Sequence, residues 1–206
     1  SSAAVIGLGW APLPFERPPA DADTAPSGQA ASIRRMLALF DSDATDLRAR
    51  CQLPVAIARL VDANVGSVSP RPADVLAIAA AREELRKEVL ERFTLALGER
   101  GGEKNAQVRE GIAQAMGLIA QPSSDGADRN ATERLIRTAK AGQEREGGLA
   151  ILALSSIAGR GGIEEEGEAA SIAADLTKLF AELATEGSAS QRPWATLALG
   201  LYENKR

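Results

Sequence analysis

The sequence contains no histidine, one cysteine and few aromatic residues, which make up 3% of its 206 positions. Without histidine, neither a Ser-His-Asp triad nor a Cys-His pair can form, and the commonest general base and zinc ligand are missing. The single cysteine, Cys51, excludes an intrachain disulfide and a cysteine-rich metal site. We therefore expect no catalytic residues, no cofactor, no metal site and no enzymatic activity.

The chain also lacks a strong basic charge and a long apolar run. Its formal net charge is −4, whereas proteins that bind nucleic acids usually carry a basic surface, so we expect no nucleic-acid partner. No apolar run reaches the roughly 18–20 residues that cross a bilayer, so we expect no membrane span. The sequence starts at Ser1 without a methionine or a basic segment, which predicts no signal peptide and indicates a piece of a longer protein or a processed product. Low cysteine content slightly favours the cytoplasm, without excluding a periplasmic or secreted location.

What the sequence does have is alanine and helical periodicity. Alanine accounts for 40 of the 206 residues and has the highest helix propensity. Apolar residues recur at spacings of three and four, and no run alternates apolar with polar residues as a strand would. The pattern predicts an all-α protein with helices over 29–40, 45–64, 72–98, 105–120, 130–142, 145–158, 164–186 and 190–203.

A few residues predict where these helices begin and end. Asn105 is expected to cap the helix over 105–120, and Asn130 with Glu133 resembles a capping box. Pro54 predicts a kink in its helix or a helix start near Gln52. The glycine-rich segment 159–162 is expected to end the helix before it.

An internal repeat links three of the helices. The segments 109–117, 147–155 and 192–200 each end in Ala, then Leu or Met, then Gly or Ser. Their last residues are 38 and 45 positions apart, and an amphipathic helix is predicted in each interval. Alternating inner and outer helices with units of about 30–47 residues are typical of an α-solenoid.

These segments resemble the HEAT-like repeats, including the bacterial type whose first helix reads roughly (V)R-x-x-A-x-x-A-L-G. The closest matches are 108–117 and 191–200, while 147–155 lacks the arginine in register and has Arg145 two residues earlier. The resemblance covers about 85–206. It implies an α-solenoid of stacked helix hairpins with about eight to nine helices, in which small residues let helices cross closely and the arginine bonds to an adjacent turn or repeat. A compact helical bundle is the alternative.

The resemblance also suggests a division of the chain. Residues 29–206 form the expected helical repeat domain, and 1–10 are the possible tail of a preceding repeat helix. Residues 11–28 hold five of the ten prolines, which predicts a loop or linker.

Two features are candidates for partner binding. Arg134, Arg137 and Lys140 fall at every third position of the predicted helix 130–142, and the next outer helix, 164–186, is acidic. This stripe either pairs with the acidic helix or contacts a partner. Trp10, beside the proline-rich segment, is the second candidate, whereas Trp194 is expected in the core.

Other features favour a structural interpretation. Cys51 is expected to be a core residue, the run 164–168 a solvated helix start and the glycine-rich segments 98–104 and 159–162 turns. The resemblance therefore implies a module for protein–protein interaction or scaffolding that binds one or more proteins. The alternative is a HEAT-like enzyme or enzyme-assembly factor, because some HEAT-like families resemble chromophore lyases or DNA-repair glycosylases. A nucleic-acid-binding solenoid is less favoured still.

Overall fold

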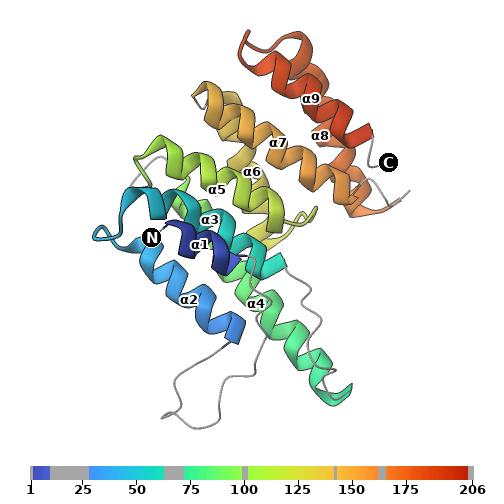
Figure 1. The fold of residues 1–206 in the computed structure, drawn as a ribbon. Helices are drawn as coiled ribbons and strands as arrows, with labels where there is room; N and C mark the ends of the chain where they lie inside the picture. The colour runs from blue at the N-terminus through green and yellow to red at the C-terminus, as the bar shows by residue number, and fades with distance from the viewer. Residues whose placement is uncertain are drawn as a thin grey trace. The chain divides into compact units, whose positions relative to one another are not determined.

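A computed structural model describes residues 2–9, 28–62, 72–98, 102–141, 143–161 and 166–203. Trp10 and nearly all of the predicted linker 11–28 lie outside these residues, as do Glu164 and Glu165. Over the described ranges the chain forms nine helices and no strand, which confirms the all-α prediction (Figure 1). The helices are α1 (Ser2–Gly9), α2 (Gly28–Asp41), α3 (Leu47–Asp62), α4 (Pro72–Ala96), α5 (Ala106–Ile119), α6 (Gly126–Ala141), α7 (Glu144–Gly161), α8 (Glu168–Thr185) and α9 (Gln191–Glu203).

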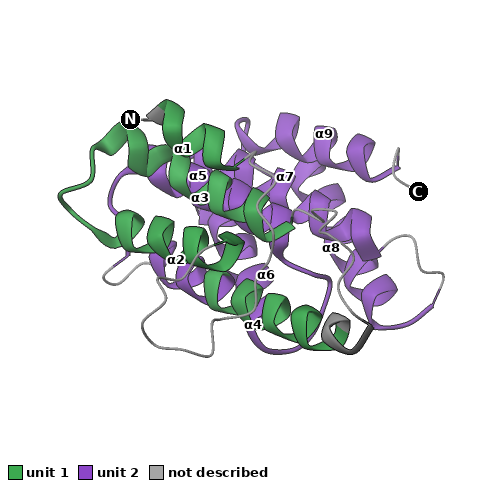
Figure 2. Ribbon diagram, turned by 60° about the horizontal axis from the view of Figure 1, so that its bottom comes forward, with its two compact units in different colours: residues 1–89 green, residues 90–206 purple. Residues whose placement is uncertain are grey.

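The chain divides into two units, Ser1–Val89 and Leu90–Arg206, and the boundary falls within α4 (Figure 2). In the first unit, α3 packs against both α1 and α2. Gly9 of α1 approaches α3 so closely that an added Cβ would lie 2.8 Å from the Cα of Ala56. The buried Gln29 joins three helices of this unit, because its amide donates to the carbonyl of Leu60 and its oxygen accepts a 3.4 Å hydrogen bond from Arg82.

Helix α3 continues through Pro54, so the prediction of a start near Gln52 is wrong. The helix begins earlier because the carboxylate of Asp46 accepts hydrogen bonds from the backbone N–H groups of Arg48 and Ala49 at 3.0 and 3.3 Å. A proline inside a helix costs about 3 kcal/mol. Burial of Leu53, Ala56, Ile57 and Leu60 along the same helix offsets this cost.

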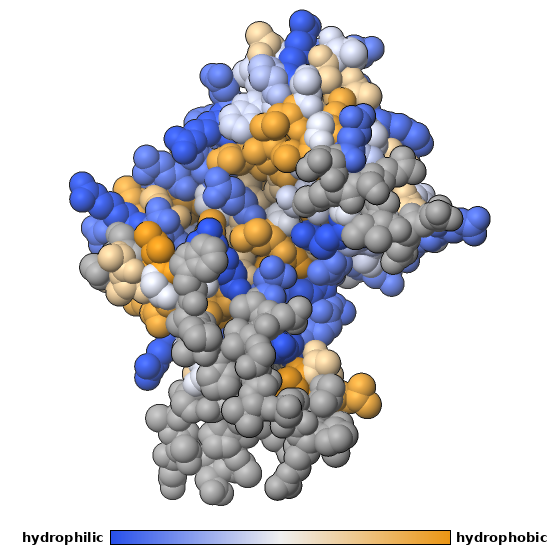
Figure 3. Space-filling view, turned by 45° about the vertical axis from the view of Figure 1, so that its right-hand side comes forward, coloured by the Kyte–Doolittle hydropathy of each residue, from blue (hydrophilic) through white to orange (hydrophobic). Residues whose placement is uncertain are grey.

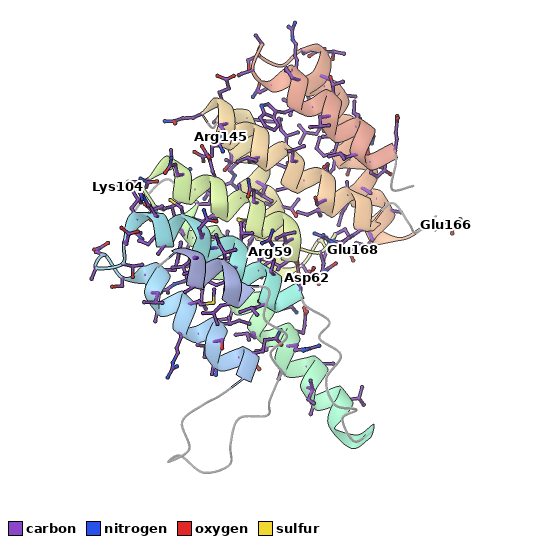
Figure 4. The ribbon with its side chains drawn as sticks, viewed as in Figure 1. Arg59, Asp62, Lys104, Arg145, Glu166 and Glu168 are labelled. Atoms are coloured by element: carbon purple, nitrogen blue, oxygen red, sulfur yellow. The ribbon has the colours of Figure 1, made fainter. Side chains whose placement is uncertain are left out.

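The second unit contains two layers of helices. Helices α5, α7 and α9 form one layer, in which α7 contacts α5 on one side and α9 on the other. Helices α6 and α8 also pack against α7 and form the second layer (Figure 1). In Figure 4, Lys104 and Arg145 mark the starts of α5 and α7 at one end of the unit, and Glu168 marks the start of α8 at the other. This sequential packing of helices i and i+2 confirms the predicted stacked arrangement.

Small residues set the spacing between the helices of the first layer. A Cβ added to Gly117 of α5 would lie 2.6 Å from the Cα of Ala153 in α7. The indole of Trp194 covers Gly148 so closely that no side chain fits there. The predicted close crossing therefore occurs at Gly117, whereas Gly200 has no atom within 4 Å of its added Cβ.

Asn105 caps α5 as predicted, with its side-chain oxygen accepting from the N–H groups of Gln107 and Val108. The capping box at Asn130 is wrong, because α6 starts at Gly126, and Asn130 is an exposed residue of its second turn. The earlier start follows from Gly126, whose φ of 55° suits glycine, and from Asp125, whose carbonyl accepts the N–H of Arg129 at 3.2 Å.

Helix α7 also ends later than the sequence predicts, because it continues past Gly159 to Gly161. Its last turn is fixed by Arg160, which donates to the carbonyl of Gly117 at 2.9 Å and to that of Ala120. These carbonyls belong to the end of α5, where the last helical C=O groups lack partners of their own. Contact with the neighbouring helix thus stabilises a turn that the local sequence disfavours.

Candidate interaction surfaces

One side of α7 is open and lies in the first layer, between α5 and α9. Apart from Glu144 in its first turn, the residues of α7 that are not buried are Arg145, Leu149, Leu152, Ser156 and Arg160. Their spacing of three and four places them on one stripe of the helix. Glu146 and Ala153 face α5 and Gly148 faces α9, so this stripe lies between the two neighbours, on the side away from α6 and α8.

Exposed leucines of α5 and α9 flank this stripe. Leu197 and Leu201 of α9 lie one turn apart and are 48% and 41% exposed. Leu197 follows Trp194 by three residues, and the indole of Trp194 covers Gly148 of α7. Leu118 of α5, next to Gly117, is 36% exposed. We call the five side chains Leu118, Leu149, Leu152, Leu197 and Leu201 the leucine face. Figure 3 shows apolar surface among hydrophilic side chains over this part of the second unit.

Two ion pairs join α5 to α7 beside the leucine face. Arg109 donates to Glu146 at 2.7 Å, and Arg145 lies 3.1 Å from Glu110 (Figure 4 labels Arg145). Arg109 also donates to the carbonyl of Glu103 at 3.3 Å. In the third repeat segment, Arg192 donates to the carbonyl of Gly187 at 2.8 Å. The prediction that the repeat arginines bond to an adjacent helix or turn is thus confirmed at both positions.

The predicted basic stripe lies on α6, in the other layer. Arg134 is half-buried, and Arg137 and Lys140 are exposed. Glu133 pairs within the same helix with Arg129 at 2.9 Å and with Arg137 at 3.5 Å. The hydrogen bond from Arg129, followed by its charge and that of Arg137, lowers the pKa of Glu133 below the ordinary 4.5. Within the described part of the chain, no ion pair joins this stripe to α8.

The remaining candidates show no site for chemistry. Cys51 is half-buried in α3, and Trp194 is half-buried against Gly148. The carboxylate of Glu168 accepts hydrogen bonds from two residues of the loop before α6. The donors are the hydroxyl of Ser123 and the backbone N–H of Ser124. The Ser124 N–H is the main cause of the lowered pKa of Glu168. No group of three or more His, Cys, Asp or Glu side chains that could hold a metal occurs among the described residues.

The leucine face was not predicted from the sequence. On the open side of α7, Leu149 and Leu152 interrupt the polar residues Arg145, Ser156 and Arg160, so no continuous polar stripe marks this side in the sequence. The available signal was the pair Leu197 and Leu201, which fall outside the buried row of α9 formed by Ala195, Ala198 and Tyr202.

The described helices and the comparisons with known proteins add two negative findings. Over the described residues, no helix combines the length and apolar character that crossing a membrane requires. Comparisons with models of known families, with curated proteins and with solved structures find no match.

Proposed function

We propose that this chain is a HEAT-like repeat module that binds another protein through the leucine face. The observation that carries the proposal is that three successive helices of one layer, α5, α7 and α9, place leucines on the same open side. Single exposed leucines are ordinary, whereas a contiguous apolar patch bordered by polar residues is typical of a protein-binding surface.

The packing around the face supports this role. Gly117 against Ala153 and Gly148 against Trp194 hold α5, α7 and α9 at short separations. A surface presented by closely packed helices loses little conformational entropy when a partner binds, which favours affinity. Leucine side chains then contribute by leaving water, at about 25 cal/mol per Å² of apolar area buried.

The HEAT-like assignment draws on the same helices. Helices α5 and α7 each have an arginine in their first turn, Arg109 and Arg145. Each of the two helices is followed by an amphipathic helix of the second layer. In repeat proteins of this kind, successive units stack on one another and a continuous row of inner helices forms the binding surface. The leucine face lies on the row formed by α5, α7 and α9.

The test compares a double variant of the leucine face with a single leucine-to-aspartate control at similar exposure. Leu197→Asp/Leu201→Asp places charges on the leucine face, and Leu39→Asp changes an α2 leucine that is 48% exposed. The wild type should retain certain proteins from native extract. We expect the double variant to bind these proteins at least about tenfold more weakly and Leu39→Asp to bind them as the wild type does. Circular dichroism checks that both variants fold. Equal retention by wild type and double variant, or equal loss with Leu39→Asp, contradicts the proposal.

A further inference from the structure

Helix α6 carries a surplus of basic side chains on the layer opposite the leucine face. Its bases are Arg129, Arg134, Arg137 and Lys140, and its acids are Asp128 and Glu133. Asp128 is buried, and its carboxylate accepts the backbone N–H of Gln121 at 2.7 Å. Glu133 is therefore the one acid of α6 that lies at the surface beside the four bases.

Glu133 cannot neutralise the whole stripe. Its two carboxylate oxygens are engaged by Arg129 and Arg137, at 2.9 and 3.5 Å. Arg134 and Lys140 have no ion pair with any described residue. The four bases and two acids of α6 leave a net charge of +2 on this helix, in a chain whose net charge is −4.

Residues outside α6 lie against the stripe at two positions. The guanidinium of Arg134 lies beside Gly98, 3.9 Å from the position of an added Cβ. At the end of α6, the side chain of Gln191 donates to the carbonyls of Ala139 and Lys140 at 2.9 and 3.2 Å. This contact from α9 fixes the turn that carries Lys140. A fixed helix presents its charges at a constant spacing, which lowers the cost of binding a complementary partner.

We propose that the α6 stripe binds an acidic segment of a partner protein, rich in Asp and Glu. Residues 129–140 span about 16 Å along the helix, a length that about five residues of an extended peptide cover. A short acidic peptide can therefore contact only the stripe. A long polyanion such as a nucleic acid would extend over the acidic side chains of the same layer, including Asp175 and Glu182 of α8, and would be repelled.

The test uses a fluorescein-labelled peptide of alternating Glu and Ser as the probe, with binding followed by anisotropy. We expect binding at low salt that weakens with added salt. The variant Arg134→Glu/Arg137→Glu/Lys140→Glu should bind at least about tenfold more weakly. The control Arg34→Glu/Arg35→Glu/Arg48→Glu changes three exposed bases of α2 and α3, alters the net charge equally and should leave binding unchanged.

Each other result overturns the proposal. These results are no binding by the wild type, equal loss with the control variant, or tighter binding of a single-stranded oligonucleotide than of the peptide. If the triple variant melts at a lower temperature, Arg137→Ala/Lys140→Ala replaces it, since both side chains are exposed. The variant Leu197→Asp/Leu201→Asp should still bind the peptide, which separates this surface from the leucine face.

Discussion

Arg109 of α5 and Glu146 of α7 form an ion pair of 2.7 Å, and their chain neighbours Glu110 and Arg145 form a second pair of 3.1 Å in the opposite sense. The dipeptide Arg109-Glu110 of α5 thus lies beside Arg145-Glu146 of α7, and each arginine pairs with the glutamate of the other helix. The Glu146 side chain is 6% exposed and that of Arg145 is 73% exposed. The first pair is therefore part of the packed interior, and the second lies at the surface.

The two pairs should differ in their contribution to stability. Glu146→Ala should lower the free energy of unfolding by about 3 kcal/mol, because it leaves the partly buried Arg109 charge without its partner. Arg145→Ala, at the exposed pair, should cost less than about 1 kcal/mol. Urea denaturation of the full chain measures both. The double variant Arg109→Met/Glu146→Leu should recover most of the loss, and a double variant as unstable as Glu146→Ala would show that the pair does not act as a unit.

Glycines at two positions of the repeat should respond in opposite directions. Gly117→Ala should destabilise the protein although alanine favours helix, because its Cβ would lie 2.6 Å from the Cα of Ala153. Gly200→Ala meets no atom within 4 Å and should stabilise α9 by about 0.5–1 kcal/mol. Thermal melting followed by circular dichroism measures both shifts. The same sign for the two variants would contradict the packing of α5 on α7.

The sequence predicted the helices correctly where local signals act alone. The cap at Asn105 is an example, since its oxygen bonds to N–H groups two and three residues later, and no distant contact is involved. The resemblance to HEAT-like repeats implied that the repeat arginine bonds to a neighbour, and Arg109 does so with Glu146.

Two of the errors occur where tertiary contacts outweigh local preference. Pro54 and Gly159 are helix breakers by composition, yet both lie inside helices whose surrounding residues are buried. In α7, Arg160 reaches the end of α5, a contact that no sequence window contains. The leucine face was missed for a related reason: exposure of Leu149 and Leu152 depends on where α5 and α9 lie, and the periodicity of α7 does not reveal this.

The carboxylate of Glu168 should make stability depend on pH in the acidic range. Hydrogen bonds from Ser124 and Ser123 lower its pKa below 4.5 in the folded protein. The contribution is therefore fully present above the unfolded pKa and is lost as the pH falls through the lower folded pKa. Glu168→Gln should lower the melting temperature at neutral pH and flatten its decrease on acidification. Glu182→Gln, at an exposed position of the same helix, is the control variant, and an equal flattening in both variants would contradict the role of Glu168.

Leu152 and Leu154 lie two residues apart on α7 and should separate folding from binding. Leu154 is fully buried, so Leu154→Ala removes contacts and leaves a cavity, at a cost of about 2–5 kcal/mol. Leu152 is half-buried on the open side, and Leu152→Ala should cost about 1 kcal/mol or less.

Binding to a protein that the wild type retains should show the reverse order. Leu152→Ala removes part of the leucine face and should weaken this binding, whereas Leu154→Ala should keep it at temperatures where the protein remains folded. Urea denaturation and the retention assay together measure both effects. If Leu152→Ala destabilises as much as Leu154→Ala, then Leu152 belongs to the core, and the open side of α7 is not a surface at all. If it leaves both stability and retention unchanged, the partner contacts another part of the second unit.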